Sequence, residues 1–358
     1  MENTYAVIMA GGAGTRFWPK SRKALPKQYL NLFGKETMIQ MVAKRLHNLL
    51  PKERIYVVST KEQEPLLRSQ LDWLPPLNII YEPFGKNTAP CIGLSAIFLN
   101  HRDPDAVMIV LPADHLIRNT ERFLEILSEG VSLVREFPNA LTTIGIQPTY
   151  PATGYGYIQK GDKVDGHDEV YQVRAFAEKP TLDVAEKFFA SGEFFWNSGI
   201  FIWQTKTILT YLESLMPDLY QGLCQIKAAM DKDNLPQVIE TVYKQIRSDS
   251  IDYGVMEKAS NVLVLKGDFG WSDVGSWEEV YNISEKDADG NVVKGKPIYK
   301  DVTNSYIEVG DRVVAVIGVD DLIIVDTEDA LLICKKDKSQ EVKWVVEKLK
   351  HQRLKKYL

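Results

Sequence analysis

The chain has 358 residues, of which 45% are hydrophobic and 25% charged, and its net charge is −5. This composition is typical of a globular protein and excludes a collagen, a disulfide scaffold and a wholly disordered chain. The length exceeds what one hydrophobic core usually serves, so we expect a large domain joined to a smaller one. Three scattered cysteines without a CxxC pair, and a start that lacks a secretory pattern, predict a cytoplasmic location.

Two classes of partner are disfavoured by the same properties. The longest apolar runs, such as residues 107–111, are too short to cross a bilayer, and a mildly acidic chain is a poor general nucleic-acid binder. The charge is uneven, however, because residues 3–35 contain no Asp or Glu. Their basic residues are Arg16, Lys20, Arg22, Lys23, Lys27 and Lys35. Such a segment indicates either a focused anion site or a solvated basic face.

Strands and helices are expected to alternate over the first 146 residues. The predicted strands are 5–10, 54–59, 78–82, 106–111 and 141–146, and the predicted helices begin at Thr37, Thr88 and Glu121. Because the strands are apolar throughout, they predict a mostly parallel sheet that is covered on both faces, as in α/β proteins.

The second half of the chain is less regular. Residues 153–203 predict strands and turns that form a lid or second half-site, and residues 206–245 predict helices. After residue 281, short strands rich in Val and Ile follow, and residues 342–354 predict an amphipathic helix. Apolar residues recur every six positions, as a short β-helix would need, at Ile307, Val313, Val319, Val325 and Leu331. We therefore predict domains at 1–280 and 281–335 and a C-terminal helix within 336–358.

Three loops follow predicted strands at the positions where α/β sheets bind ligands. They are Gly11–Arg16 after the first strand, Gly85–Pro90 after the third and Pro112–Asp114 after the fourth. Ligands bind outside the carboxyl ends of parallel strands, so the three loops are expected to meet at one sheet edge.

The glycine-rich loop at residues 11–16 matches neither of two well-known phosphate motifs. A dinucleotide fingerprint would need glycine where Phe17 stands, and no Gly-Lys-Ser/Thr follows as in a P-loop. Glycines still let the backbone approach a phosphate, and Arg16 offers a planar fork of donors. The alternative is a tight turn beside surface lysines. The arginine, the acid-free run and the strand-end position together favour phosphate binding.

Two aspartates far apart in the sequence are candidate metal ligands. Asp114 follows the fourth strand, and Asp273 lies in a turn-like segment flanked by Trp271 and Trp277. Mg²⁺ takes few protein carboxylates and completes its octahedron with phosphate oxygens and water, so this pair suits a metal–triphosphate complex. Asp268 competes for the second position, and His115 is expected to be structural.

Six motifs in this order resemble the sugar-nucleotide pyrophosphorylases, specifically the mannose-1-phosphate guanylyltransferases. The first, residues 11–22 (GGAGTRFWPKSR) with 26–28 (PKQ), resembles the family's signature. It is followed by 82–90 (EPFGKNTAP), 111–115 (LPADH), 176–180 (FAEKP), 196–199 (WNSG) and 271–277 (WSDVGSW). The resemblance covers nearly the whole chain. It implies a Rossmann-like nucleotidyltransferase domain and a small C-terminal β-helix-like domain. It also implies that these 358 residues include no isomerase barrel like that of the longer family members.

The resemblance also implies roles for individual residues. Arg16 and Lys27 would hold the β- and γ-phosphates of GTP, and Lys179 would bind the phosphate of mannose 1-phosphate. Mg²⁺ would be held by Asp114 and Asp273. The nucleotide would further be contacted by Gly11, Gly12, Gly14, Thr15, Asn87 and Thr88, and the mannose by Gly154, Glu178 and Asn197.

The reaction implied is transfer of GMP from GTP to mannose 1-phosphate. Two alternatives remain open: a pyrophosphorylase for another sugar or base, and a catalytically idle, nucleotide-sensing scaffold. The β-rich appendage with its terminal helix suggests a homodimer by analogy with the fold. No nucleic-acid or membrane partner is expected.

Overall fold

The computed structural model describes residues 1–12 and 14–358. Its internal contacts form two compact units. The first comprises residues 1–11 and 42–271, and the second comprises residues 12–41 and 272–358. The glycine-rich segment thus belongs with the C-terminal strands, while the predicted domain borders at 280 and 335 stay a prediction. No helix in the described ranges is long and apolar enough to cross a membrane.

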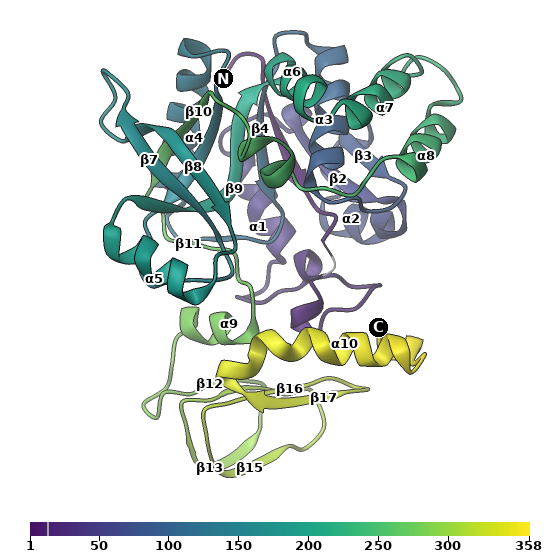
Figure 1. Cartoon of the computed structure of the whole chain (residues 1–358). Helices are drawn as coiled ribbons and strands as arrows, with labels where there is room; N and C mark the ends of the chain where they lie inside the picture. Colours follow the sequence, from purple (N-terminus) through teal and green to yellow (C-terminus); the bar gives the residue numbers. More distant parts are fainter. Residues whose placement is uncertain (13) are drawn as a thin grey trace. The chain divides into compact units, whose positions relative to one another are not determined.

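The first unit is built on a nine-stranded sheet of order β3-β2-β1-β4-β9-β6-β10-β8-β7 (Figure 1). The strands are β1 (Thr4–Met9), β2 (Ile55–Thr60), β3 (Ile79–Glu82), β4 (Val107–Pro112), β6 (Leu141–Ile146), β7 (Gly156–Lys163), β8 (Val170–Glu178), β9 (Phe194–Gln204) and β10 (Val262–Gly267). A separate short strand, β5, spans Leu116–Ile117.

The α/β class is confirmed, but the sheet is more mixed than the mostly parallel one expected. β1 pairs in parallel with β2 and β4, β2 with β3, and β6 with β10. β9 is antiparallel to β4, β6 and β7, and β8 is antiparallel to β7 and β10. The short connection between β7 and β8 permits only antiparallel pairing, since parallel strands need a crossover of a dozen or more residues.

Helices cover both faces of this sheet, as the apolar strands predict (Figure 1). One face carries α3 (Thr88–Arg102), α6 (Thr205–Leu215), α7 (Pro217–Lys227) and α8 (Leu235–Gln245), and α4 (Thr120–Glu136) packs on β4, β6, β9 and β10. Val7 and Val110 belong to the large core under α3 and α6, while Ile8 and Leu111 are buried on the opposite face. Alternate residues of each strand thus serve two cores.

The predicted elements of the first 146 residues agree with the structure to within about three residues. Three further helical pieces were not predicted: α2 (Glu64–Gln70), α5 (Leu182–Ser191) and a π-helical turn, η6 (Asp252–Met256). α5 lies inside the region expected to hold only strands and turns. Its Ala185 is buried, but both Leu182 and Phe189 are exposed, so the apolar stripe that marks a helix is incomplete.

The second unit consists mainly of short parallel strands in two sheets. One has the order β12-β14-β16-β17 and the other pairs β13 with β15. The strands are β12 (Val292–Lys294), β13 (Ile298–Thr303), β14 (Tyr306–Glu308), β15 (Ala315–Asp320), β16 (Leu322–Asp326) and β17 (Leu331–Lys335). The β-helix-like appendage is confirmed.

The six-residue spacing predicted for this region is wrong. Ile307 and Val325 are buried, but Val313 is 82% exposed and Leu331 43% exposed. Val292 pairs with Tyr306, which pairs in turn with Ile323, so one coil takes far more than six residues. Coils of unequal length with turns between them remove any strict sequence period.

The remaining elements of the chain have the following bounds. η1 (Thr15–Phe17), η2 (Lys27–Tyr29), α9 (Trp277–Ile283), η7 (Lys336–Glu341) and α10 (Val342–His351) lie in the second unit, while α1 (Met38–His47) and β11 (Trp271–Ser272) contain the borders between units. Helix α10 contacts η1 and η7, which confirms a C-terminal helix packed on the appendage. The ring centroids of Phe17 and Trp277 lie 5.1 Å apart, so the early segment joins this unit's core.

Candidate active site

The carboxyl ends of β1, β3 and β4 lie at the same edge of the first unit's sheet, because these strands belong to one parallel set. Gly11 comes two residues after β1, Glu82 is the last residue of β3, and Asp114 comes two residues after β4. The expected convergence of three loops is therefore observed.

A buried carboxylate at this edge was missed as a separate site residue. Glu82 is 2% exposed, and the hydroxyl of Tyr243 on α8 donates to its Oε1 at 3.1 Å. A Cβ atom placed on Gly11 would lie 3.4 Å from Glu82 Oε2. Burial raises the pKa of Glu82 to about 7. Only its place at the end of an apolar strand, beside a glycine-rich loop, could have signalled it.

The N-terminus of α3 follows, and here Asn87 and Thr88 have defined local bonds. Asn87 has φ 69°, a conformation that non-glycine residues rarely adopt, and its side chain accepts a bond of 2.9 Å from the Thr88 amide. Thr88 Oγ1 accepts from the amide of Ile251 at 2.9 Å. These bonds fix the loop around the helix start.

Asp114 is half-buried in the turn after β4. The neighbouring His115 accepts a bond from Trp271 Nε1 at its Nδ1, 3.1 Å away, which agrees with a structural histidine. The competing aspartate is engaged elsewhere, since Asp268 Oδ1 pairs with Arg122 Nε of α4 at 2.7 Å. Asp268 therefore fits a surface ion pair better than a metal site.

A second group of predicted residues meets on strands β7, β8 and β9. Glu178, at the end of β8, forms an ion pair with Lys179, whose side chain is 57% exposed. A Cβ atom on Gly156 would overlap Glu178 Oε2 and lie 3.4 Å from the Cβ of Asn197. The absence of a side chain at Gly156 thus leaves the space in which the Glu178 carboxylate lies beside Asn197.

Asn197 connects this group to a carboxylate that sequence reasoning missed. Its Nδ2 donates to Asp252 Oδ1 at 2.8 Å, and its Oδ1 accepts from the Gly199 amide at 3.1 Å. Burial, followed by the nearby charge of Glu178, raises the pKa of Asp252 to about 6. Asp252 lies in the unpredicted turn η6, which is why no motif indicated it. Glu178, Lys179, Asn197 and Asp252 are called the carboxylate cluster below.

In the second unit, Gly14 and Lys27 fit together closely. Gly14 has φ 58°, and a Cβ atom there would overlap the Cβ of Lys27 and lie 3.0 Å from its backbone nitrogen. Lys27 is only 4% exposed, and its Nζ donates to the backbone carbonyl of Asp273 at 2.7 Å. The structure therefore joins the first and last motifs of the chain through one lysine.

The turn that carries Asp273 is held by Glu279 of α9, another residue that the motifs did not single out. Glu279 Oε1 accepts from Ser272 Oγ and its Oε2 from the Gly275 amide, both at 2.9 Å. Val274, between them, has φ 48°. Because a β-branched residue is strained in this conformation, the glutamate bonds and the turn must hold it there.

Four predicted residues are distinguished by accessibility rather than by contacts. Arg16 and Gly12 are exposed in the second unit, Thr15 is half-buried there, and Gly154 is exposed in the first unit. Within the described ranges the Arg16 side chain makes no hydrogen bond or ion pair, so its guanidinium can meet a ligand without breaking a bond. A Cβ atom on Gly12 or Gly154 would meet no described atom within 4 Å.

The predicted metal ligands have the chemistry that a hard divalent cation needs. Asp114 and Asp273 are both half-buried, and both oxygens of Asp273 lie 3.3 Å from the position that a Cβ atom of Gly275 would take. A side chain at Gly275 would thus crowd the carboxylate. Among the described residues no cluster of three or more His, Cys, Asp or Glu could hold a metal. Two carboxylates suit a cation that takes its other ligands from a substrate.

Family comparisons agree with the architecture of both units. The model described as "Nucleotidyl transferase" matches residues 5–290, and that described as "MannoseP isomerase/GMP-like beta-helix domain" matches residues 288–349. The first match covers well over half of the chain, and the second falls on the β-helix-like strands.

Individual relatives give the same result at higher resolution. A mannose-1-phosphate guanylyltransferase of Klebsiella pneumoniae is 41% identical over 98% of this chain and 75% of its own length. One of Escherichia coli is 41% identical over 96% of this chain and 73% of its own length. A crystal structure described as a mannose-1-phosphate geranyltransferase from Thermus thermophilus has a TM-score of 0.87. It is 32% identical over 97% of this chain and 99% of its own.

The sheet edge, the glycine-rich loop and the β-helix-like strands thus agree with relatives that match almost the whole chain. Enzymes of this kind generally use a divalent metal, which the two aspartates suit. The chain belongs to the nucleotidyl transferase family and, within it, to the mannose-1-phosphate guanylyltransferases.

Proposed function

We propose that this chain transfers GMP from GTP to α-D-mannose 1-phosphate, giving GDP-mannose and pyrophosphate. The relatives named for this activity support the choice of substrates. The observation that carries the proposal is the seat of Lys27 on Gly14 with its bond to the Asp273 carbonyl. A buried ammonium between a glycine-rich loop and a carboxylate turn is suited to a polyanion bound with a cation.

The proposed chemistry needs no general base. The phosphate of the sugar is ionised at neutral pH, so one of its oxygens attacks the α-phosphorus of GTP in line. The new P–O bond forms as the bond to the β-phosphate oxygen breaks, and pyrophosphate leaves with the negative charge. Arg16 and Lys27 stabilise that charge, and Lys179 positions the attacking phosphate.

We propose Mg²⁺ as the divalent cation, with Asp114 and Asp273 as its protein ligands. When bound, the metal supplies positive charge to the phosphate oxygens. The chain's own part is to hold the two carboxylates, and Glu279 does so for the Asp273 turn through its bonds to Ser272 and Gly275.

The remaining contacts are proposed from motif positions and local geometry. Backbone and side chains of the nucleotide loops contact GTP, namely Gly11, Gly12, Gly14, Thr15, Asn87 and Thr88. On the sugar side we propose that Glu178, Asn197 and Gly154 contact the mannose hydroxyls. Carboxylates and amides suit hydroxyl groups because they accept their hydrogen bonds.

A substrate matrix tests the proposal directly. Purified protein is incubated with each of four NTPs and with mannose, glucose and heptose 1-phosphates, and release of pyrophosphate is measured. We expect GTP with mannose 1-phosphate to give the highest kcat/KM, and the reverse reaction to proceed, because one phosphoanhydride replaces another. A higher kcat/KM with another pair would identify a pyrophosphorylase for that sugar or base. Nucleotide binding without turnover on any pair would identify a sensing scaffold.

Two properties of the intact protein are also proposed: a homodimer and a cytoplasmic location. Light scattering after size-exclusion chromatography tests the first, and a mass near that of one chain would contradict it. Fractionation of cells that express the full-length protein tests the second.

A further inference from the structure

The acid-free basic segment has two different fates in the second unit. Arg16 is exposed and Lys27 is seated on Gly14, as a phosphate site requires. Lys20 and Arg22 instead form ion pairs with Glu308 of β14 and with Asp329, which follows β16. The C-terminal strands thus neutralise part of the charge that the sequence alone attributes to an anion site.

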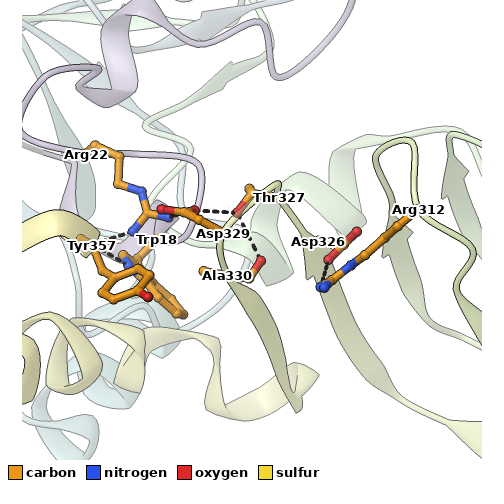
Figure 2. Close-up of polar contacts among 8 residues, drawn as sticks. All are labelled: Trp18, Arg22, Arg312, Asp326, Thr327, Asp329, Ala330 and Tyr357. Atoms are coloured by element: carbon orange, nitrogen blue, oxygen red, sulfur yellow. Dashed lines mark hydrogen bonds and ion pairs between the residues drawn. The ribbon is translucent and has the colours of Figure 1, made fainter.

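Arg22 makes the more informative of these contacts, shown in Figure 2. Its Nη2 donates to Asp329 Oδ1 at 2.8 Å, and its Nη1 donates to the backbone carbonyl of Tyr357. Trp18 Nε1 donates to the same carbonyl at 2.9 Å, and the guanidinium lies 5.4 Å from the Trp18 ring centroid. One arginine thereby joins the signature segment to two separate places in the last 30 residues.

Bonds within the segment connect Arg22 to the glycine-rich loop. Ser21 Oγ donates to the Gly14 carbonyl at 2.6 Å, and the Arg22 and Leu25 backbones pair through two bonds of 3.0 Å. The second of these turns ends next to Pro26 and Lys27, where η2 begins. Displacement of Arg22 would therefore act on Gly14 from one side and on Lys27 from the other.

The backbone of Trp18 is fixed independently of Arg22. Trp277 Nε1 donates to the Trp18 carbonyl at 3.1 Å, and the Trp277 side chain is fully buried. Loss of the Arg22 contacts should therefore leave the unit folded while the segment between Trp18 and Lys27 gains freedom.

We propose that Arg22 is a positioning residue. Anchored by Asp329 and the Tyr357 carbonyl, it holds the Gly14–Lys27 loop in the conformation that binds the β- and γ-phosphates of GTP. This inference rests on the proposed function. It gives the C-terminal strands and tail a role in nucleotide binding, through contacts that never touch the substrate.

The geometry explains why an arginine stands at this position. Its planar fork places two nitrogens on two acceptors at once, whereas a lysine ammonium offers one compact charge. Arg22→Lys should therefore retain the attraction to Asp329 and lose the simultaneous bond to the tail. We expect its effect to fall between those of the wild type and Arg22→Ala.

A matched ion pair in the same unit supplies the control. Arg312 pairs with Asp326 of β16, and this pair lies outside residues 12–41 (Figure 2). Arg312→Ala removes an arginine–aspartate pair of the same type without touching the loop. Any general effect of losing such a pair should appear equally in Arg22→Ala and Arg312→Ala.

The experiment compares Arg22→Ala, Asp329→Asn, their double variant and Arg312→Ala. Each is measured for Tm, for GTP affinity by calorimetry, and for KM and kcat with both substrates. Because misplacement of a binding group by about 1 Å can cost 10²-fold, we expect Arg22→Ala to lower kcat/KM for GTP by about 10- to 100-fold. GTP affinity should fall with it, while the KM for mannose 1-phosphate stays unchanged.

The double variant tests whether the pair acts as one unit. If it does, Arg22→Ala combined with Asp329→Asn should be no worse than Arg22→Ala alone. Equal GTP affinity in Arg22→Ala, Asp329→Asn and Arg312→Ala would overturn the inference, as would a rise in KM for both substrates alike. A wild-type protein that binds GTP but releases no pyrophosphate would instead refute the proposed function, and the calorimetric comparison would still test the positioning role.

Discussion

The two substrate-facing regions of this chain are built from opposite materials. In the second unit, the glycine-rich loop uses backbone, a glycine at φ 58° and one buried lysine. In the first unit, the carboxylate cluster and Glu82 place acidic side chains in sites from which water is largely excluded. Their pKa values are accordingly raised, to about 6 for Asp252 and about 7 for Glu82.

The difference follows from what each region has to bind. Phosphate oxygens accept hydrogen bonds, so backbone amides and cations suit them, and their arrangement depends on loop geometry. Hydroxyls and base edges donate hydrogen bonds, so buried carboxylates and amides suit them. The first region should therefore be sensitive to geometry and the second to protonation, and the predictions below test that division from the largest effect to the smallest.

Removal of the buried lysine should have the largest effect. Lys27→Ala takes away the charge that stabilises the departing pyrophosphate, so we expect kcat to fall by about 10²–10³. Steady-state release of pyrophosphate measures it. Lys35→Ala, in the same basic segment but exposed, is the control and should retain wild-type turnover. Full activity in Lys27→Ala would refute the assigned role.

A single methyl group should disturb the loop nearly as much. In Gly14→Ala the new Cβ would overlap Lys27 and force a residue with a side chain into φ 58°. The lysine has to move, and we expect kcat/KM to fall by about 10²-fold. Gly310→Ala, whose Cβ would meet no described atom within 4 Å, should be neutral. Equal kinetics in the two variants would mean that the close fit is unimportant.

The buried carboxylate Glu82 should make stability depend on pH. Its folded-state pKa of about 7 lies above the ordinary value of 4.5, so between these values the folded chain binds more protons than the unfolded chain. The free energy of unfolding should therefore contain a term that falls by about 2 kcal/mol from pH 5 to pH 7.

Urea denaturation at pH 5, 6 and 7 measures this term by comparing the wild type with Glu82→Gln. Because the glutamine does not titrate, the variant should lose less stability than the wild type as the pH rises. Glu347→Gln, on an exposed position of α10, should keep the wild-type slope. Parallel slopes for the wild type and Glu82→Gln would show that Glu82 titrates normally.

Disruption of the carboxylate cluster should have the smallest effect, confined to the sugar. Asn197→Ala removes the 2.8 Å bond to Asp252 and leaves a buried oxygen without that donor. We expect the KM for mannose 1-phosphate to rise by about tenfold, with the KM for GTP unchanged. Asn100→Ala, on α3, is the matched control. A change in the KM for GTP alone would assign Asn197 to the other substrate.

The strands and loops of the first 146 residues could be read from the sequence because apolar runs and glycine signals coincide there. The motif residues could be named for the same reason, and the structure brings Gly14 to Lys27 and Lys27 to Asp273. These are short-range patterns, or patterns that a resemblance supplies.

Glu82, Asp252 and Glu279 could not be predicted as site residues, because their significance depends on burial and on partners distant in sequence. The true partners of Lys20 and Arg22 were hidden for the same reason, since Glu308 and Asp329 lie some 300 residues away. The six-residue spacing failed because coils of unequal length share no fixed period.

The contact between Trp18 and the Tyr357 carbonyl has a consequence for biosynthesis. The ribosome must add the 339 residues that separate them before the signature segment can reach its anchor. At 5–20 residues per second this takes roughly 20 to 70 s. During that interval the sheet of the first unit can assemble, while the loop proposed to bind triphosphate stays unanchored. A nascent chain would thus acquire its anchored nucleotide loop only near the end of translation.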